Sequence, residues 1–178
     1  IKLVLVVGAR PQIEEELAAR GLEPRYHKGL RVTDARAMDC VKRANGSIRI
    51  DVEALFSQVR PNTPMAGSTI EVASGNFLTA RPVGVVDGID HGYTGTVRKV
   101  DVEALNDALV DADIVLMQPY GYSLTGEVFN LCMEEVAESV AIALQAIKLI
   151  YLCDAPGLLG EAHQGFHVPP VHALVAEH

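Results

Sequence analysis

The chain opens with a strand, a glycine turn and a helix, and this order constrains its fold more than any other feature. Lys2 to Val7 form an apolar run, as expected for a strand buried on both faces. The turn Gly8-Ala9-Arg10-Pro11 follows, and Gln12 to Arg20 have the apolar spacing of a helix that ends at Gly21. Strand, turn and helix form the opening unit of an α/β sheet. We therefore predict an α/β fold with a mainly parallel sheet.

A second helical region follows a polar, irregular stretch. Thr33 or Asp34 can cap a helix that runs through Ala44 with Met38 and Val41 facing inward. The pair Asn45-Gly46 is predicted to break this helix. A second amphipathic stretch, from about Ile48 to Val59, then ends at two prolines.

The rest of the chain alternates short strands with two more helices. The predicted strands are Thr69–Ala73, Phe77–Ala80, Gly95–Val100, Ile114–Met117 and Lys148–Leu152, and the predicted helices run from an Asp101 cap to Ala112 and over Met133–Ala146. The strands between residues 69 and 100 are expected to form hairpins at the edge of the sheet. Tyr120 to Asn130 is predicted to be a long loop, and no clear periodicity remains after Gly160.

Composition narrows the class of protein. The 178 residues are 49% hydrophobic and 21% charged, which indicates a globular domain. The net charge of -8 argues against nucleic acid and against an anionic membrane surface as partners. No apolar run approaches the roughly 20 residues that span a bilayer, and no leader peptide is visible. We expect a cytoplasmic protein, and because the chain begins within a strand pattern we expect a fragment.

Cysteine and histidine give no sign of a metal centre. Cys40, Cys132 and Cys153 are far apart and form no CxxC pair, so we predict free, buried thiols. Several histidines gather near the C-terminus at irregular spacing and without an HExxH pattern. We therefore predict no metal site and no catalytic nucleophile in this chain.

Three loops are expected at the carboxyl edge of the sheet, where open α/β folds bind ligands. They are Gly8–Pro11, Gly29–Asp34 and Gly126–Glu134. The first offers backbone N–H groups at a helix N-terminus, which suit a carboxylate or phosphate. Arg31 can clamp a carboxylate or form a structural salt bridge, and Asn130 can orient a ligand or cap the next helix. With no Walker loop, GxGxxG or nucleophile elbow in the chain, residue chemistry indicates only a small anionic ligand.

Five strings of residues, taken together and in order, resemble the N-acetylglutamate synthase family. They are Val6–Ile13, Tyr26–Asp34, Ser74–Phe77, Arg81–Asp90 and Gly126–Leu131. The resemblance covers roughly residues 2–160 and implies a three-layer αβα amino-acid-kinase-like fold, truncated at both ends. It implies a partial amino-acid-kinase-like domain over 1–160, a divergent tail over 161–178, and an acetyltransferase domain that is absent from this sequence.

The related N-acetylglutamate kinases differ from this chain at the first and last of these loops. Their glycine run is interrupted here by Ala9 and Arg10, and the Arg10 side chain should restrict the approach of a phosphoryl group. Their Asn-x-Asn-Ala-Asp string reads Asn130-Leu131-Cys132-Met133-Glu134 in this chain. Because phosphoryl transfer depends on positioning and charge neutralisation, these changes argue against kinase activity.

The resemblance also implies a function. Synthases of this family transfer acetyl from acetyl-CoA to L-glutamate in the first step of arginine biosynthesis, and their amino-acid-kinase-like domain regulates the enzyme and builds a homo-oligomer. It implies no cofactor in this chain, with acetyl-CoA as a substrate of the missing domain. The matching positions Gly8, Ala9, Arg31 and Asn130 are expected to line a vestigial pocket for arginine, glutamate or N-acetylglutamate. An active N-acetylglutamate kinase and a purely structural assembly module remain the alternatives.

Overall fold

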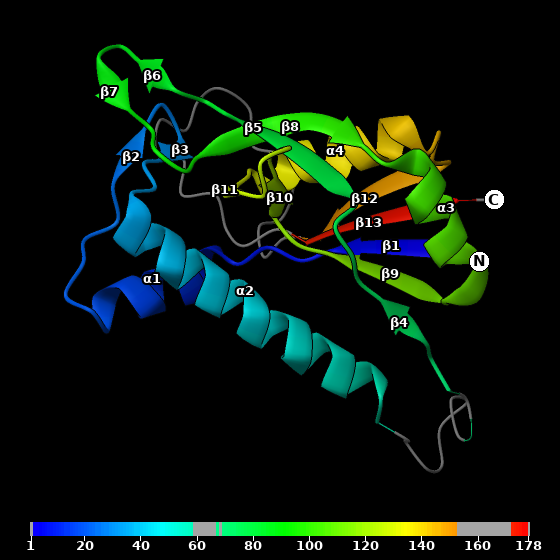
Figure 1. Ribbon diagram of the computed structural model, residues 1–178. Helices are drawn as coiled ribbons and strands as arrows, with labels where there is room; N and C mark the ends of the chain where they lie inside the picture. The colour runs from blue at the N-terminus through cyan, green and yellow to red at the C-terminus, as the bar shows by residue number, and fades with distance from the viewer. Residues whose placement is uncertain (1, 59–66, 68, 153–171, 178) are drawn as a thin grey trace, which may run out of the picture.

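A five-stranded sheet forms the middle of the molecule (Figure 1). The computed structural model describes residues 2–58, 67, 69–152 and 172–177. The strand order is β12-β13-β1-β9-β4, with bounds Lys148–Leu152, His172–Glu177, Lys2–Val6, Ile114–Met117 and Val72–Ala73. Strands β1, β9 and β4 are parallel to one another, whereas β13 is antiparallel to both of its neighbours. The predicted mainly parallel sheet is therefore confirmed.

Helices cover both faces of this sheet. The helices α1 (Arg10–Ala18) and α2 (Ala35–Phe56) lie on one face, and α3 (Val102–Asp111) and α4 (Met133–Ala143) belong to the other (Figure 1). Successive residues of β9 face opposite sides of the sheet. Leu116 packs with α1 and α2, whereas Val115 and Met117 pack with α3 and α4. All four residues of β9 are buried, as a strand covered on both faces requires. The three-layer αβα architecture is confirmed.

A second sheet adds to the α3 and α4 layer. Its order is β11-β10-β5-β8, with bounds Val128–Asn130, Tyr120–Tyr122, Leu78–Pro82 and Gly95–Val100. Phe77, Leu78 and Phe129 share a core with Val4 and Val6 of the central sheet. Two small hairpins complete the fold, β2 (Tyr26–His27) with β3 (Leu30–Arg31), and β6 (Val85–Val86) with β7 (Ile89–Asp90). The antiparallel pairing expected between residues 69 and 100 is present, but β5 and β8 pair within the second sheet, and only β4 lies at the edge of the central one.

Three expectations about local structure were wrong. The segment 120–130 is a hairpin of β10 and β11 rather than a loop, and a backbone hydrogen bond from Ser123 N to Glu127 O closes its turn. The first helix begins at Arg10, not Gln12, because Pro11 can occupy the first turn without losing a hydrogen bond. The tail contributes β13 between β12 and β1, although its sequence shows no strand periodicity. The domain boundary at residue 160 stays a prediction.

The helix α2 is continuous, so the predicted break at Asn45-Gly46 was also wrong. Asn45 is buried, and its side-chain Nδ2 donates to the carbonyl oxygen of Val41 at 2.8 Å. The backbone carbonyl oxygen of Asn45 accepts a hydrogen bond from Nε2 of Gln118. Buried residues on both sides of Gly46, among them Val41 and Ile48, pack against the central sheet. Tertiary packing therefore outweighs the low helix propensity of these two residues.

Replacing Gly46 with alanine tests this continuity. Gly46 is exposed, lacks a positive φ, and has no other atom within 4 Å of an added Cβ. Because glycine in a helix interior costs roughly 0.5–1 kcal/mol relative to alanine, Gly46→Ala should raise the free energy of unfolding by that amount. Urea unfolding followed by circular dichroism measures it. A loss of stability would mean that the helix is broken at Gly46.

The structure also bears on the predicted burial of the cysteines and on the length of apolar helices. Cys40 is fully buried as predicted, Cys132 is only half-buried, and Cys153 lies outside the described residues. No helix among the described residues is both long and apolar enough to cross a membrane.

Candidate functional site

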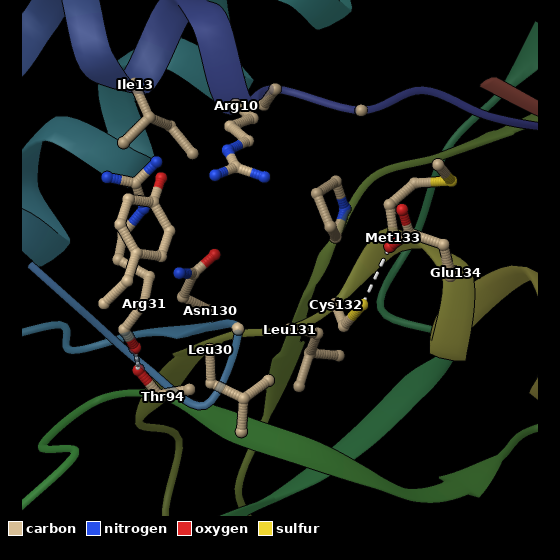
Figure 2. A pocket seen from close by; sticks show the side chains of 15 residues that line it. Arg10, Ile13, Leu30, Arg31, Thr94, Asn130, Leu131, Cys132, Met133 and Glu134 are labelled. Atoms are coloured by element: carbon tan, nitrogen blue, oxygen red, sulfur yellow. Dashed lines mark hydrogen bonds between the residues drawn. The ribbon is translucent and has the colours of Figure 1, made fainter. Parts of the chain in front are cut away.

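A pocket of about 460 Å³ lies where the chain leaves the carboxyl ends of β1 and β9. Its lining comes from all three predicted loops and from four other positions: Gly8, Ala9, Arg10, Ile13, Tyr26, Gly29, Leu30, Arg31, Thr94, Pro119, Asn130, Leu131, Cys132, Met133 and Glu134. Figure 2 shows the labelled residues arranged around a common space. The location agrees with the general rule for ligand sites in open α/β sheets.

The four predicted site residues meet in this pocket. Gly8, Ala9, Arg31 and Asn130 all line it, although up to 122 positions separate them in sequence. Asn130 does not cap the following helix, because Cys132 occupies the N-cap position of α4. Whether the pocket holds a ligand stays a prediction.

Two helix N-termini open into the pocket. The N-cap residues are Ala9 for α1 and Cys132 for α4, and neither helix has a side-chain cap among the described residues. The first N–H groups of a helix lack partners within it and carry a partial positive charge. Both helix starts therefore favour an oxygen-rich, anionic group in the space between them.

Arg31 supplies a full positive charge to the same space. The residue is only 7% exposed, and its Nη1 has no hydrogen-bond partner within the described part of the chain. Its Nη2 donates to Oε1 of Glu14 over a long 3.4 Å. A buried guanidinium is costly unless its donors are satisfied. Arg31 thus forms the salt bridge that the sequence allowed, lines the pocket, and keeps one buried donor without a partner among the described residues.

Glu14 lies at the centre of a cluster behind this wall of the pocket. Its Oε1 accepts hydrogen bonds from Tyr26 Oη at 2.6 Å, from Arg31 Nη2 and from Arg10 Nε at 3.5 Å. The guanidinium carbons of Arg10 and Arg31 lie 4.7 and 4.8 Å from the centroid of the Tyr26 ring. Both distances fall within the range of cation–π attraction. One carboxylate and one ring therefore orient both arginines.

The protonation of this cluster follows from its contacts. Burial alone raises the pKa of Glu14, but the hydrogen bond from Tyr26 and the charges of Arg31 and Arg10 together lower it below the usual 4.5. Burial, and then the hydrogen bond to Glu14, raise the pKa of Tyr26. At neutral pH Glu14 is therefore a carboxylate and Tyr26 a neutral donor.

The lowered pKa of Glu14 predicts a pH-dependent contribution to stability. A carboxyl group whose pKa is lowered by folding stabilises the fold above its unfolded value and loses that effect as the pH falls through its folded value. Glu14→Gln should therefore lower the free energy of unfolding at pH 7 by at most about 1 kcal/mol, because the pair is partly exposed. The difference between the variant and wild type should shrink below pH 4.5. Glu15→Gln, on the exposed side of α1, is the matched control. A difference that persists unchanged at pH 3 would contradict this assignment.

A buried hydrogen-bond network positions Arg31 and Asn130. Thr94 donates its hydroxyl to the carbonyl oxygen of Arg31, and its Oγ1 lies 2.9 Å from Oγ1 of Thr33. Asn130 Nδ2 donates to the same Thr33 oxygen at 3.2 Å. Backbone bonds run beside these contacts, from Tyr93 N to Thr33 O at 2.7 Å and from Asn130 N to Tyr93 O at 2.8 Å. Three segments from distant parts of the sequence are thereby fixed in register.

Gly92 permits the close approach on which this network depends. Its φ is +56°, and a Cβ at this position would lie 2.5 Å from the carbonyl oxygen of Thr33. Gly92→Ala should therefore lower the free energy of unfolding by well over 1 kcal/mol, since both the backbone conformation and the contact are unfavourable. Urea unfolding measures the effect. Gly46→Ala, the same substitution at a position with free space, is the control variant. Equal stability of Gly92→Ala and wild type would contradict the described crossing.

The opposite end of the pocket carries a thiol and a carboxylate. Cys132 Sγ donates to Oε2 of Glu134 at 2.8 Å, which Figure 2 marks with a dashed line. Burial, and then the hydrogen bond to Glu134, raise the pKa of Cys132 to about 11. The thiol is therefore protonated at neutral pH and is a poor nucleophile. No lysine lines the pocket, and no three metal-binding side chains cluster, in the portion of the chain that is described.

Comparison with known proteins adds the family context. The sequence profile described as the amino acid kinase family matches residues 1–165. The chain belongs to the amino acid kinase family. This membership agrees with the observed αβα layers.

The chain is similar to proteins named amino-acid acetyltransferase or N-acetylglutamate synthase. An amino-acid acetyltransferase of Ralstonia nicotianae is 52% identical over 157 residues, which is 88% of this chain and 35% of the relative. The structure of N-acetylglutamate synthase from Neisseria gonorrhoeae with coenzyme A and L-arginine gives a TM-score of 0.74 at 41% identity over 82% of this chain. The same synthase with coenzyme A and N-acetyl-glutamate gives 0.67 at 41% identity over 79%. The chain spans about a third of the length of these proteins.

Sequence reasoning missed some residues of the site. Tyr26 and Glu14 were not predicted, although Glu14 follows Arg10 by one helical turn and such i,i+4 pairs face each other. Thr94 was missed because its contact with residue 31 spans 63 positions, and no local pattern signals it. Cys132 and Glu134 were noted only as departures from the kinase pattern, yet both line the pocket.

Proposed function

We propose that this chain is the amino-acid-kinase-like part of an N-acetylglutamate synthase, an amino-acid acetyltransferase that transfers acetyl from acetyl-CoA to L-glutamate in arginine biosynthesis. Within that enzyme its pocket binds a small amino-acid ligand, arginine, glutamate or N-acetylglutamate, by a carboxylate. Acetyl transfer belongs to a separate domain, so acetyl-CoA is a substrate there and this chain needs no cofactor. The names of its relatives and its match to about a third of their length support this assignment.

The observation that carries the ligand proposal is the unused Nη1 of Arg31. This donor is buried without a partner among the described residues, on a side chain that lines the pocket together with Asn130 and the N-cap residue of α1. A carboxylate could accept from the guanidinium, from the helix N–H groups and from the Asn130 amide, which are the groups that hold carboxylates most firmly. An apolar or cationic group would leave Arg31 unsatisfied in this position.

The pocket is a poor site for phosphoryl transfer. That reaction needs donors or metal ions to neutralise the charge on the transferred oxygens. Here no lysine faces the pocket in the described residues. Arg10 also occupies space beside the start of α1 that glycine would leave open. We therefore favour ligand binding without catalysis over the kinase alternative.

Regulation, assembly and location complete the proposal. Ligand occupancy of this domain would report the level of an amino acid to the acetyltransferase domain, in a homo-oligomer located in the cytoplasm. The net charge of -8 fits a small-molecule partner rather than nucleic acid or a membrane surface.

Calorimetric titration of the chain with L-arginine, L-glutamate and N-acetyl-L-glutamate tests the ligand proposal. At least one should bind, and Arg31→Lys should weaken it by about 10- to 100-fold, because lysine cannot reproduce the planar two-donor contact. Arg36→Lys, an exposed arginine on α2 outside the pocket, is the control. If none of the three binds, or if both variants match wild type, the proposal is wrong.

The kinase alternative has its own measurement. Incubation with ATP, Mg²⁺ and N-acetyl-L-glutamate should release no ADP above background. ADP release that Glu134→Ala abolishes would overturn the assignment of this pocket as non-catalytic.

A further inference from the structure

Two short hairpins meet beside the pocket. The β2–β3 hairpin supplies part of the pocket lining, namely Tyr26, Gly29, Leu30 and Arg31. In the described part of the chain the β6–β7 hairpin supplies none of it, yet the two hairpins lie together at one end of the molecule (Figure 1). A two-stranded hairpin is marginally stable by itself, so β2–β3 needs contacts with the rest of the fold to hold its side chains at the pocket.

The network around Thr33 fixes only the open end of the β2–β3 hairpin. Thr94 donates its hydroxyl to the carbonyl oxygen of Arg31, at the point where β3 leaves the hairpin. Thr33 N continues this attachment with a hydrogen bond to the carbonyl oxygen of His91 at 3.2 Å. The turn at the other end, Lys28-Gly29, is not part of this network. Its position therefore depends on other contacts.

Asp87 joins the turns of the two hairpins. Its Oδ2 lies 2.5 Å from Nζ of Lys28 and 3.1 Å from Nε2 of His27. Lys28 and Asp87 each open a two-residue turn with a positive φ, +49° and +51°, as type I′ turns require, so both turns have the same geometry. The hydrogen bond from Lys28, and then the one with His27, hold the pKa of Asp87 below its usual 3.8. Asp87 is therefore a carboxylate at neutral pH.

His91 supports the same turn from the inside. The residue is 1% exposed, and the centroids of its ring and the His27 ring lie 5.7 Å apart. Neither ring nitrogen of His91 has a hydrogen-bond partner among the described residues, so the ring contributes packing rather than polar contacts. Its backbone N donates to the carbonyl oxygen of Gly84 at 3.0 Å, and its own carbonyl accepts from Thr33. His91 thus joins the base of the β6–β7 hairpin to the network that holds β3.

We infer that Asp87 is a positioning residue for the pocket and acts through the β2–β3 hairpin. Asp87 does not line the pocket in the described structure, but it holds His27 and Lys28, which lie between the lining residues Tyr26 and Gly29. A hairpin that leaves its place for part of the time lowers the apparent affinity by the fraction of molecules in which it remains. The inference rests on the proposed function, because it concerns the same ligand site.

The direction of two charge-removing substitutions tests this inference. Asp87→Asn removes a negative charge near the pocket, so Coulomb attraction alone would strengthen the binding of the anions L-glutamate and N-acetyl-L-glutamate. Lys28→Gln would by the same argument strengthen the binding of L-arginine, a net cation. Loss of positioning predicts the opposite in both cases, a weakening of about 2- to 5-fold, which is the size expected when contacts between partly exposed charges are lost. Calorimetric titration with the three probes measures these changes.

Three further variants show whether the Asp87 contacts are responsible. Asp87→Glu keeps a carboxylate that can reach Lys28, and it should restore most of the affinity lost in Asp87→Asn. The double variant of Lys28→Gln and Asp87→Asn should bind no more weakly than the weaker single variant, because each substitution removes the same contact. Asp107→Asn, the same substitution at an exposed position of α3, is the control and should leave the affinities unchanged.

A measurement without ligand separates this inference from the proposed function. Hydrogen–deuterium exchange of the segment 26–31 should be about 2- to 5-fold faster in Asp87→Asn than in wild type or Asp107→Asn, because the hairpin opens more often. If a probe binds wild type and binds the matching variant at least as tightly, the inference is wrong while the proposed function stands. If no probe binds wild type, the proposed function fails. Faster exchange would then still show that Asp87 holds the hairpin, and unchanged exchange would overturn that as well.

Discussion

The pocket depends on a crossing of three chain segments around Thr33. The segment that carries Arg31, the turn that contains Gly92 and Thr94, and the end of β11 at Asn130 are joined there by backbone and hydroxyl hydrogen bonds. Thr33 and Thr94 are almost fully buried, so each of these bonds is formed where water cannot replace it. Because the three segments come from three different parts of the sequence, the fold must form before the pocket exists.

Charge is arranged around this crossing in two layers. Arg10 and Arg31 line the pocket, and Glu14 with Tyr26 orients them by hydrogen bonds and ring contacts. One acid therefore offsets one of the two positive charges and leaves roughly one for a ligand. At the other end, the thiol of Cys132 and the start of α4 hold Glu134. The kinase-like scaffold thus keeps a site for a carboxylate at the Arg31 end, and no lysine lines the pocket among the described residues.

Much of the fold could be read from local patterns. The run at β1, the Asp101 cap of α3 and the apolar spacing of α4 each predicted the observed element, because burial and capping act over a few neighbouring residues. The break expected at Asn45-Gly46 failed because Gln118, 73 positions away, and the core on both sides hold α2 together. The strand β13 was missed because its pairing with β1 and β12, rather than its own pattern, defines it.

The site, too, could be predicted from the sequence only in part. Gly8, Ala9, Arg31 and Asn130 were found by resemblance and by the rule for sheet edges, and the structure brings all four together. Tyr26 and Thr94 could not be found that way, since their roles arise from contacts across the fold. Residue types and spacing predicted a small anionic ligand, and only the arrangement revealed the opposite charge at the far end of the pocket.

A crystal structure of the chain with a bound amino-acid ligand tests the central claim most directly. That claim is that Arg31 receives a carboxylate in the pocket between α1 and α4. The account predicts a ligand carboxylate oxygen within hydrogen-bond distance of Arg31 Nη1, with Glu14 still bonded to Tyr26. A ligand bound elsewhere, or bound here with its carboxylate turned away from Arg31, would contradict it.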